Sequence, residues 1–203
     1  MSEILLYGTS LSGHCHRVEA LLRLLDVPYT LIDTDQDARK RADFLRLNPL
    51  GQIPAIVDGD IVIADSAAIL VYLAKRYDPS GRWLPEDPLG AARVQRWLAI
   101  AAGELKYGPA AARALLRWKR PGDLGGAQQI AGRLFTFMEQ HLDGRAFLAG
   151  EGPTLADLAM YAYTARAPEG GVDLEPYPRI RAWIDRIEGL EGMLIMPHLP
   201  SAA

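Results

Sequence analysis

Short apolar runs alternate with helical periodicity over the first 77 residues of the chain. Two compact runs predict buried strands, and a further pair around the turn Asp58-Gly59-Asp60 predicts a β-hairpin. The expected strands cover residues 4–7, 29–32, 55–57 and 61–63, and the expected helices run from residue 14 to before Pro28, from about 37 to 47, and from 67 to 77. The order β-α-β-α-β-β-α is typical of a two-layer domain with a mixed sheet.

The pattern changes after residue 78, where proline and glycine interrupt it. Residues 79–87 contain Pro79, Gly81 and Pro85, which is typical of an interdomain linker. Helices are expected throughout the rest, from residue 89 to 107 and on past Pro109, then over about 126–142, 154–167 and 177–187. We therefore expect a first domain over residues 1–78, a linker over 79–87 and an all-helical second domain over 88–203.

Two features of the second half predict local geometry. Pro109 lies inside the longest helical pattern, so a kink is expected near residues 106–108. Thr154-Leu155-Ala156-Asp157 resembles a capping box, with Asp157 in place of the usual Glu or Gln. This motif predicts a stable helix start in the core of the second domain.

Composition narrows the class of protein. The chain has 203 residues, of which 49% are hydrophobic, enough for a sizeable core. A net charge of -3 with mixed signs argues against nucleic acid or an anionic membrane surface as a partner. Cys15 is the only cysteine, so no internal disulfide can form, and no apolar run approaches the ~20 residues that span a bilayer. We expect a cytoplasmic protein with a small substrate.

The stretch from Leu47 to Ser66 carries the most specific signal. Pro54 opens an apolar run, and a proline belongs only at the first position or the edge of a strand. A trans bond is the default, because only about one X–Pro bond in twenty is cis in folded proteins. A cis bond would turn the backbone groups of Ile53 outward, where a peptide could dock as an extra strand.

Asp65-Ser66 directly precedes the helical pattern that begins at Ala67. Taken alone, Asp65 is read as an N-cap whose carboxylate accepts from the first-turn N–H groups. The same helix end could instead hold a ligand carboxylate while Asp65 takes a ligand ammonium.

Together, Asn-Pro-x-Gly-Gln-Ile-Pro over residues 48–54 and Asp-Ser eleven residues after Pro54 resemble the glutathione-binding half of the cytosolic glutathione S-transferases. The resemblance extends to Leu5-Leu6-Tyr7-Gly8 and is nearest to bacterial, serine-type, theta/nu-like members. It implies a thioredoxin-like N-terminal domain with a mixed four-stranded sheet, an all-α C-terminal helical bundle and a homodimer. It also implies that Pro54 is cis, that Ile53 pairs with the cysteinyl backbone of glutathione, and that Asp65 and Ser66 bind the γ-glutamyl end.

The resemblance places a catalytic serine at the start of the first helix, where Ser12 stands. Thr9 and Ser10 are competing hydroxyls, and Ser12 can also be read as a plain N-cap. A free thiol has a pKa of about 8.5 and reacts as the thiolate. A hydroxyl donor at a helix N-terminus stabilises that anion, and lowering the thiol pKa by about two units corresponds to roughly 2.7 kcal/mol.

Cys15 is the second candidate for the sulfur chemistry, because some relatives form a mixed disulfide with glutathione through a nearby cysteine. A lone cysteine one turn into a helix is more often a buried small hydrophobe. His14 and His16 are two residues apart and do not face each other on a helix, so no metal site is expected. His14, where many relatives have Asn, is a possible accessory residue.

Basic residues near the second helix are candidates for the glycyl carboxylate of glutathione. Arg39 and Lys40 could bind this carboxylate, as basic residues near the same position do in relatives. They can equally form a solvated helix face. Gln52 is the better candidate because it is held in the turn beside Ile53. Tyr107, at the expected kink, is a possible accessory residue toward the electrophile.

These features predict a glutathione transferase that activates the glutathione thiol for attack on small electrophiles, a detoxification reaction. Glutathione would be the co-substrate, and no metal is expected. One alternative is a non-catalytic glutathione-binding or regulatory module of the same fold. It stays open because His14 and Asp65 stand where many relatives have Asn and Glu. Another is a glutathione-dependent isomerase, peroxidase or disulfide reductase.

Overall fold

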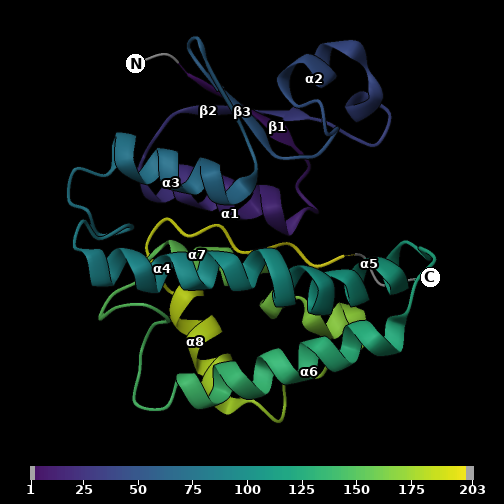
Figure 1. The fold of residues 1–203 in the computed structure, drawn as a ribbon, viewed down its shortest axis with the longest axis vertical. Helices are drawn as coiled ribbons and strands as arrows, with labels where there is room; N and C mark the ends of the chain where they lie inside the picture. Colours follow the sequence, from purple (N-terminus) through teal and green to yellow (C-terminus); the bar gives the residue numbers. More distant parts are fainter. Residues whose placement is uncertain (1–2, 200–203) are drawn as a thin grey trace. The chain divides into compact units, whose positions relative to one another are not determined.

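The computed structural model describes residues 3–199, which fall into two compact units. Unit 1 comprises the chain up to Gly81 together with Glu191–Pro197, and unit 2 comprises Arg82–Leu190 with His198 and Leu199. Figure 1 shows the strands confined to unit 1 and long helices in unit 2. Within residues 3–199, no helix is both long and apolar enough to cross a membrane.

Unit 1 is built on a mixed four-stranded sheet, as expected. Its strands are β1 (Ile4–Gly8), β2 (Tyr29–Asp33), β3 (Ala55–Asp58) and β4 (Ile61–Ala64). The strand order is β2-β1-β3-β4, with β1 and β2 parallel and the other two pairs antiparallel. β1 alternates buried and half-buried residues, with Ile4 and Leu6 wholly buried.

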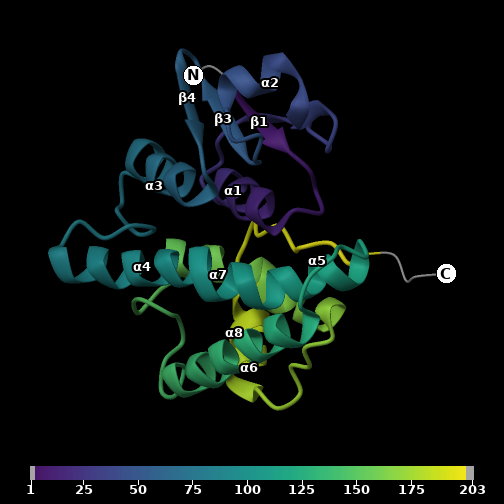
Figure 2. The ribbon, with the colours of Figure 1, turned by 45° about the vertical axis from the view of Figure 1, so that its right-hand side comes forward.

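The helices of unit 1 are α1 (Gly13–Leu24), the 3-10 turn η1 (Ala38–Lys40), α2 (Ala42–Leu47) and α3 (Ser66–Tyr77). Both views show α1 and α3 side by side on one face of the sheet, with α2 beyond the other face (Figures 1 and 2). The single helix expected over residues 37–47 is wrong. Arg41 has an extended backbone (φ -73°, ψ 148°), which separates η1 from α2.

The C-terminal segment Glu191–Pro197 belongs to unit 1, whereas the sequence had placed it in the second domain. His16 Nε2 lies 2.7 Å from the Leu194 carbonyl oxygen, and Met196 is fully buried. The segment has no helical periodicity to mark it, so its attachment depends on tertiary contacts that a local pattern does not reveal.

Unit 2 is all-helical, as expected. Its helices are α4 (Pro88–Ile100), the π-helical segment η2 (Ala101–Ala110), α5 (Ala111–Arg117), α6 (Leu124–His141), α7 (Leu155–Ala165), the 3-10 turn η3 (Ala167–Gly170) and α8 (Pro178–Glu188). Every residue of α7 is buried, so α7 forms the centre of the bundle. The expected capping box is confirmed, with Asp157 Oδ2 accepting from the Thr154 N–H at 2.9 Å.

Pro109 lies inside η2, around the position where a kink was expected. Proline lacks an N–H, and its ring clashes with the carbonyl four residues earlier in an α-helix. The wider π winding over Ala101–Ala110 avoids that clash while the helix continues into α5.

Candidate functional site

The predicted binding residues of unit 1 emerge from one end of its sheet. Tyr7 of β1 pairs with Ala55 of β3, and Ala55 pairs in turn with Ala64 of β4. The loop after β1 leads to Ser12, the residues before β3 are Ile53-Pro54, and Asp65 follows β4. The strand directions therefore bring the three predicted segments to the same end of the sheet, although they are far apart in sequence.

Ser12 is the N-cap of α1. Its backbone is extended (φ -86°, ψ 118°), and its Oγ accepts from the Cys15 N–H at 3.4 Å. The side chain is partly accessible, whereas Cys15 behind it is 1% exposed. Because a hydroxyl both donates and accepts, accepting from Cys15 leaves the Ser12 O–H as a donor. Ser12 is thus a cap by geometry and still has a hydrogen to offer.

Cys15 packs against β1. A Cβ atom on Gly8 would come within 2.7 Å of the Cys15 sulfur, so the strand needs glycine at this close approach. Burial raises the pKa of the Cys15 thiol, and hydrogen bonds from Ser12 and Thr9 oppose that rise without cancelling it. Cys15 has the environment of a structural thiol rather than of a reactive one.

The turn before β3 holds Ile53 in place. The Asn48 side chain donates to the Gln52 carbonyl at 2.7 Å and accepts from the Leu50 N–H at 3.1 Å. The Ile53-Pro54 peptide bond is cis. Among residues 3–199, no hydrogen bond reaches the backbone N–H or C=O of Ile53. The Gln52 side chain is exposed and Pro54 is buried.

Asp65 caps α3 with an unusual backbone. Its Oδ1 accepts from the N–H groups of Ala67 and Ala68 at 2.8 and 3.2 Å. Its φ is +75°, a region in which a residue other than glycine is strained. The capping interpretation is therefore right, and the exposed carboxylate still has its second oxygen available to a ligand.

Ser66 connects the first turns of α1 and α3. Its buried Oγ accepts from Arg17 Nη1 at 3.4 Å and lies 3.3 Å from His14 Nδ1. Among residues 3–199, no hydrogen bond from the Ser66 N–H is found. His14 thus contacts Ser66, the residue predicted to bind the γ-glutamyl end, which gives this accessory candidate a defined position.

Arg17 was missed by the sequence analysis. It is only 2% exposed, although arginine is seldom buried without a partner. A signal was present, since Arg17 lies one turn before Leu21 on the apolar face of the predicted helix. A charged residue at such a position indicates a buried polar contact, which the structure shows to be Ser66.

The basic candidates near η1 lie in different surroundings. Arg39 is half-buried and donates through Nε to the Asp35 carbonyl at 3.1 Å. Its backbone carbonyl lies 3.3 Å from where a Cβ on Gly51 would stand, so η1 approaches the turn before Ile53. Lys40 is exposed and pairs with Asp37 at 2.9 Å, as expected for a solvated helix face.

Tyr107 belongs to η2 in unit 2 and is 59% exposed. The Lys106 ammonium lies 5.3 Å from its ring centroid. Arg113, on α5, is buried, with Nε 2.6 Å from Glu169 Oε2. Arg113 therefore stabilises the interior of the helical bundle.

The sheet, its cis proline and the helical bundle define a two-domain protein with a thioredoxin-like first domain. Two family models match this chain. The model of the glutathione S-transferase N-terminal domain matches residues 11–76, and that of the glutathione S-transferase C-terminal domain matches residues 126–191. Glutathione S-transferase 3 of Zea mays is 34% identical to this chain, covering 92% of this chain and 90% of its own length. The chain belongs to the glutathione S-transferase family.

Other relatives agree in fold and sequence. Human glutathione S-transferase theta-1 is 30% identical, over 92% of this chain and 83% of its own. A crystal structure of a glutathione S-transferase from Xanthobacter autotrophicus has a TM-score of 0.86 and 36% identity, covering 96% of this chain and 97% of its own. A glutathione transferase homologue from Drosophila mojavensis, solved with bound glutathione, has a TM-score of 0.82 and 26% identity, covering 94% of this chain and 90% of its own.

Proposed function

We propose that this chain is a cytoplasmic glutathione transferase, which holds glutathione at one end of the sheet in unit 1 and directs its sulfur at small electrophiles. The observation that carries the proposal is the pairing of Tyr7, Ala55 and Ala64, because it brings three binding segments to that end. The Drosophila mojavensis relative with bound glutathione supports the choice of ligand. The reaction is typical of detoxification.

The backbone of glutathione docks on Ile53. A peptide running along this segment completes the pairing that β3 leaves open before Pro54, since the Ile53 N–H and C=O face it as donor and acceptor. The γ-glutamyl carboxylate accepts from the N–H and hydroxyl of Ser66 at the positive end of α3. The γ-glutamyl ammonium pairs with the free oxygen of Asp65. Pro54 and Gln52 shape the turn before β3. The exposed side-chain amide of Gln52 is a further donor for the glycyl carboxylate of glutathione.

The sulfur of glutathione is stabilised as an anion by Ser12. The Ser12 O–H donates to the thiolate while its oxygen stays oriented by the Cys15 N–H. The thiolate then attacks the electrophile, its sulfur lone pair forms the new bond and the leaving group departs with its electrons. No general base is needed once the thiol is ionised.

The glycyl carboxylate of glutathione is assigned to the basic side of the turn. Arg39 is a stronger candidate than Lys40, because its side chain is half-buried and its backbone carbonyl lies beside Gly51. Lys40 is engaged with Asp37 and contributes long-range attraction only. His14 positions Ser66 through the contact between its Nδ1 and the Ser66 Oγ.

The functional assembly is proposed to be a homodimer. β4 is an edge strand whose Ile61 and Val62 side chains are 46% and 45% exposed. Exposed apolar groups on a strand edge are usually covered by a partner. Sedimentation velocity should give twice the monomer mass, and a monomer at micromolar concentration would contradict this part.

A combined binding and turnover assay tests the function. Calorimetry with glutathione should show one binding site per chain, and a panel of aryl halides, isothiocyanates, peroxides and disulfides should then reveal conjugation. Absence of glutathione binding would contradict the proposal as a whole. Binding without turnover across the panel would favour the non-catalytic module, which the His14 and Asp65 departures motivate. Turnover of peroxides or disulfides without a conjugate would favour the reductase alternative.

A further inference from the structure

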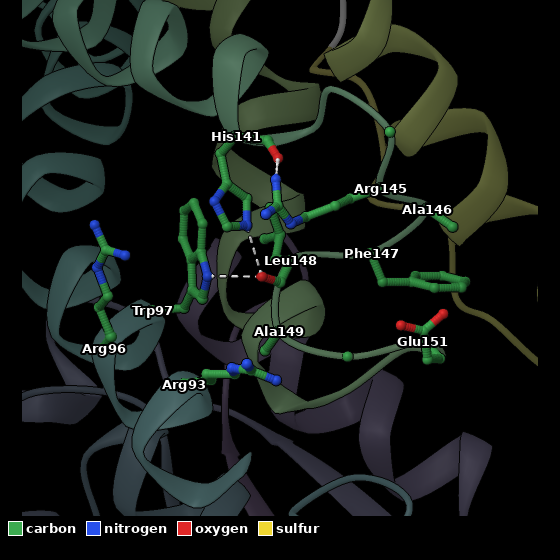
Figure 3. Close-up of a pocket in the computed structure, with 12 residues that line it drawn as sticks. Arg93, Arg96, Trp97, His141, Arg145, Ala146, Phe147, Leu148, Ala149 and Glu151 are labelled. Carbon is green, nitrogen blue, oxygen red and sulfur yellow. Dashed lines mark hydrogen bonds between the residues drawn. The ribbon is translucent and has the colours of Figure 1, made fainter. Parts of the chain in front are cut away.

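A pocket of about 340 Å³ lies wholly within unit 2. It is an open pocket lined by α4, the C-terminal end of α6 and the loop over residues 144–151 (Figure 3). This volume is within the range of small-molecule sites, which is roughly 300–1,000 Å³. None of the residues assigned to glutathione lines it. The pocket is therefore distinct from the proposed glutathione site.

The charges around the pocket are unequal. Three arginines line it, Arg93 and Arg96 from α4 and Arg145 from the loop, against the single carboxylate of Glu151. Arg93 and Arg96 are three residues apart on α4, and Figure 3 shows Arg96 on the side of Trp97 away from Arg145. The Arg96 guanidinium lies 5.3 Å from the Phe137 ring centroid. Within residues 3–199, none of the three guanidinium groups forms an ion pair.

The wall behind these arginines is fixed by hydrogen bonds. The Leu148 carbonyl accepts from Trp97 Nε1 at 3.0 Å and from His141 Nε2 at 2.8 Å. Arg145 Nη1 donates to the His141 carbonyl at 2.8 Å, and Figure 3 shows its side chain reaching across the loop to do so. The loop at Leu148 and Arg145 is therefore tied to α4 and to the end of α6 before any ligand enters.

The electrostatic effect of the arginines reaches the pocket wall. Burial is the main cause that lowers the pKa of His141, and its hydrogen bond to the Leu148 carbonyl opposes this. The positive charges of Arg145 and Arg96 lower the pKa by smaller amounts. The opposing carboxylate is Asp157, whose oxygen accepts from the Leu148 N–H behind the wall. The positive charges of Arg145 and Arg96 therefore act on this wall, and positive charge favours an anion in the pocket.

We propose that this pocket is a second ligand site, which binds a small organic dianion such as a phosphate monoester through Arg93, Arg96 and Arg145. Guanidinium groups present paired N–H donors that match the oxygens of phosphate and carboxylate. Three such groups exceed the need of a single carboxylate and suit a doubly charged group. Phe147, on the loop, gives the organic part an apolar wall.

Calorimetry with 1-naphthyl phosphate tests the proposal, with uncharged 1-naphthol as the matched probe. We expect 1-naphthyl phosphate to bind with a Kd below about 1 mM and the double variant Arg93→Gln/Arg96→Gln to weaken it at least about tenfold. Arg133→Gln is the control, because Arg133 is exposed on α6 and does not line the pocket. The same titration with glutathione present should be unchanged.

Three results would overturn the proposal. The first is no binding of 1-naphthyl phosphate, and the second is binding that the double variant leaves unchanged. The third is equal affinity for 1-naphthol, which would mean that charge is not recognised. Arg93 and Arg96 are both exposed, so the variants should keep the melting temperature of the wild type, which circular dichroism checks. Failure here would leave glutathione binding at Ile53 and Asp65 intact.

Discussion

The helices α1 and α3 of unit 1 begin with caps of opposite character. Ser12 caps α1 with a neutral hydroxyl in extended backbone, through one hydrogen bond of 3.4 Å. Asp65 caps α3 with a charged carboxylate at φ +75°, through two hydrogen bonds of 2.8 and 3.2 Å. The first cap leaves a donor hydrogen and a positive helix end for an anion, whereas the second already supplies negative charge that can take a cation.

The difference between the two caps matches two groups of glutathione, the central cysteinyl thiolate and the γ-glutamyl ammonium. A thiolate needs a hydrogen-bond donor, which Ser12 offers, and an ammonium needs a carboxylate, which Asp65 offers. Ser66 joins the two sites, since its Oγ contacts both Arg17 and His14 of α1. A helix N-terminus alone attracts anions, such as the γ-glutamyl carboxylate proposed at Ser66, so the Asp65 carboxylate is what allows the α3 site to take a cation as well.

Removing the Ser12 hydroxyl should have the largest effect on activity. We expect Ser12→Ala to lower kcat/KM for conjugation about 100-fold, because two pKa units of thiolate stabilisation correspond to about 2.7 kcal/mol. Ser12→Gly should lose as much although glycine is a tolerated N-cap, and Ser12→Thr should restore most of the rate. Full activity of Ser12→Gly would show that the hydroxyl is only structural.

Removing the Asp65 carboxylate should have the largest effect on stability. Asp65→Ala keeps the Cβ at φ +75° but loses both hydrogen bonds of the cap, so we expect a cost of about 2 kcal/mol. Asp65→Gly should cost about 1 kcal/mol less, because glycine adopts that φ readily. Urea unfolding measures both variants, and equal losses would show that the backbone conformation carries no cost.

Removing only the charge of Asp65 separates capping from binding. Asp65→Asn keeps an oxygen for the N–H groups of Ala67 and Ala68, so unfolding should change little. The Kd of glutathione should rise about tenfold, since a charged contact to the ammonium is lost. Asp87→Asn, at the cap of α4, is the matched control and should leave that Kd unchanged. An unaltered Kd in Asp65→Asn would remove Asp65 from the ligand site.

Replacing Cys15 should have the smallest effect on activity. We expect Cys15→Ala to keep kcat/KM within about threefold, because the thiol is buried and held protonated. A large loss of activity with wild-type stability would instead favour the cysteine as the sulfur partner of glutathione.

The same variant tests the pKa of Cys15. A raised pKa in the folded state means that the unfolded chain loses the thiol proton first as the pH rises above about 8.5. Fewer protons are then bound by the unfolded chain, so this group makes wild-type stability fall from there up to the folded pKa, by at most about 1.4 kcal/mol per pH unit. Cys15→Ala should lack that part of the slope in urea unfolding between pH 8 and 10, and identical slopes would contradict the raised pKa.

Local pattern was enough to predict the strands of unit 1 and the capping box at Thr154. It was also enough to identify Pro54 as an unusual strand entry and Asp65 as a helix N-cap, although the positive φ of Asp65 was not predicted. The helix over residues 37–47 was wrong, because apolar spacing does not report the extended backbone of Arg41. Arg17 was missed because its partner Ser66 is 49 residues away in sequence.

The site as a whole could be anticipated only through the strand order. Ser12, Ile53 and Asp65 come together because β1, β3 and β4 pair with Tyr7, Ala55 and Ala64 in one row. Periodicity predicts each strand but not which strands are neighbours, so the resemblance to a known family supplied that step. The basic pocket of unit 2 had no sequence signal, since Arg93 and Arg145 are 52 positions apart and meet only through the packing of α4 and the loop after α6.

Ultraviolet titration of bound glutathione tests the central claim most directly, because the thiolate absorbs where the thiol does not. The wild-type complex should show the thiolate at neutral pH, and Ser12→Ala should show it only at a pH about two units higher, with Ser12→Thr close to wild type. An unchanged thiolate at neutral pH in Ser12→Ala would contradict the role assigned to Ser12.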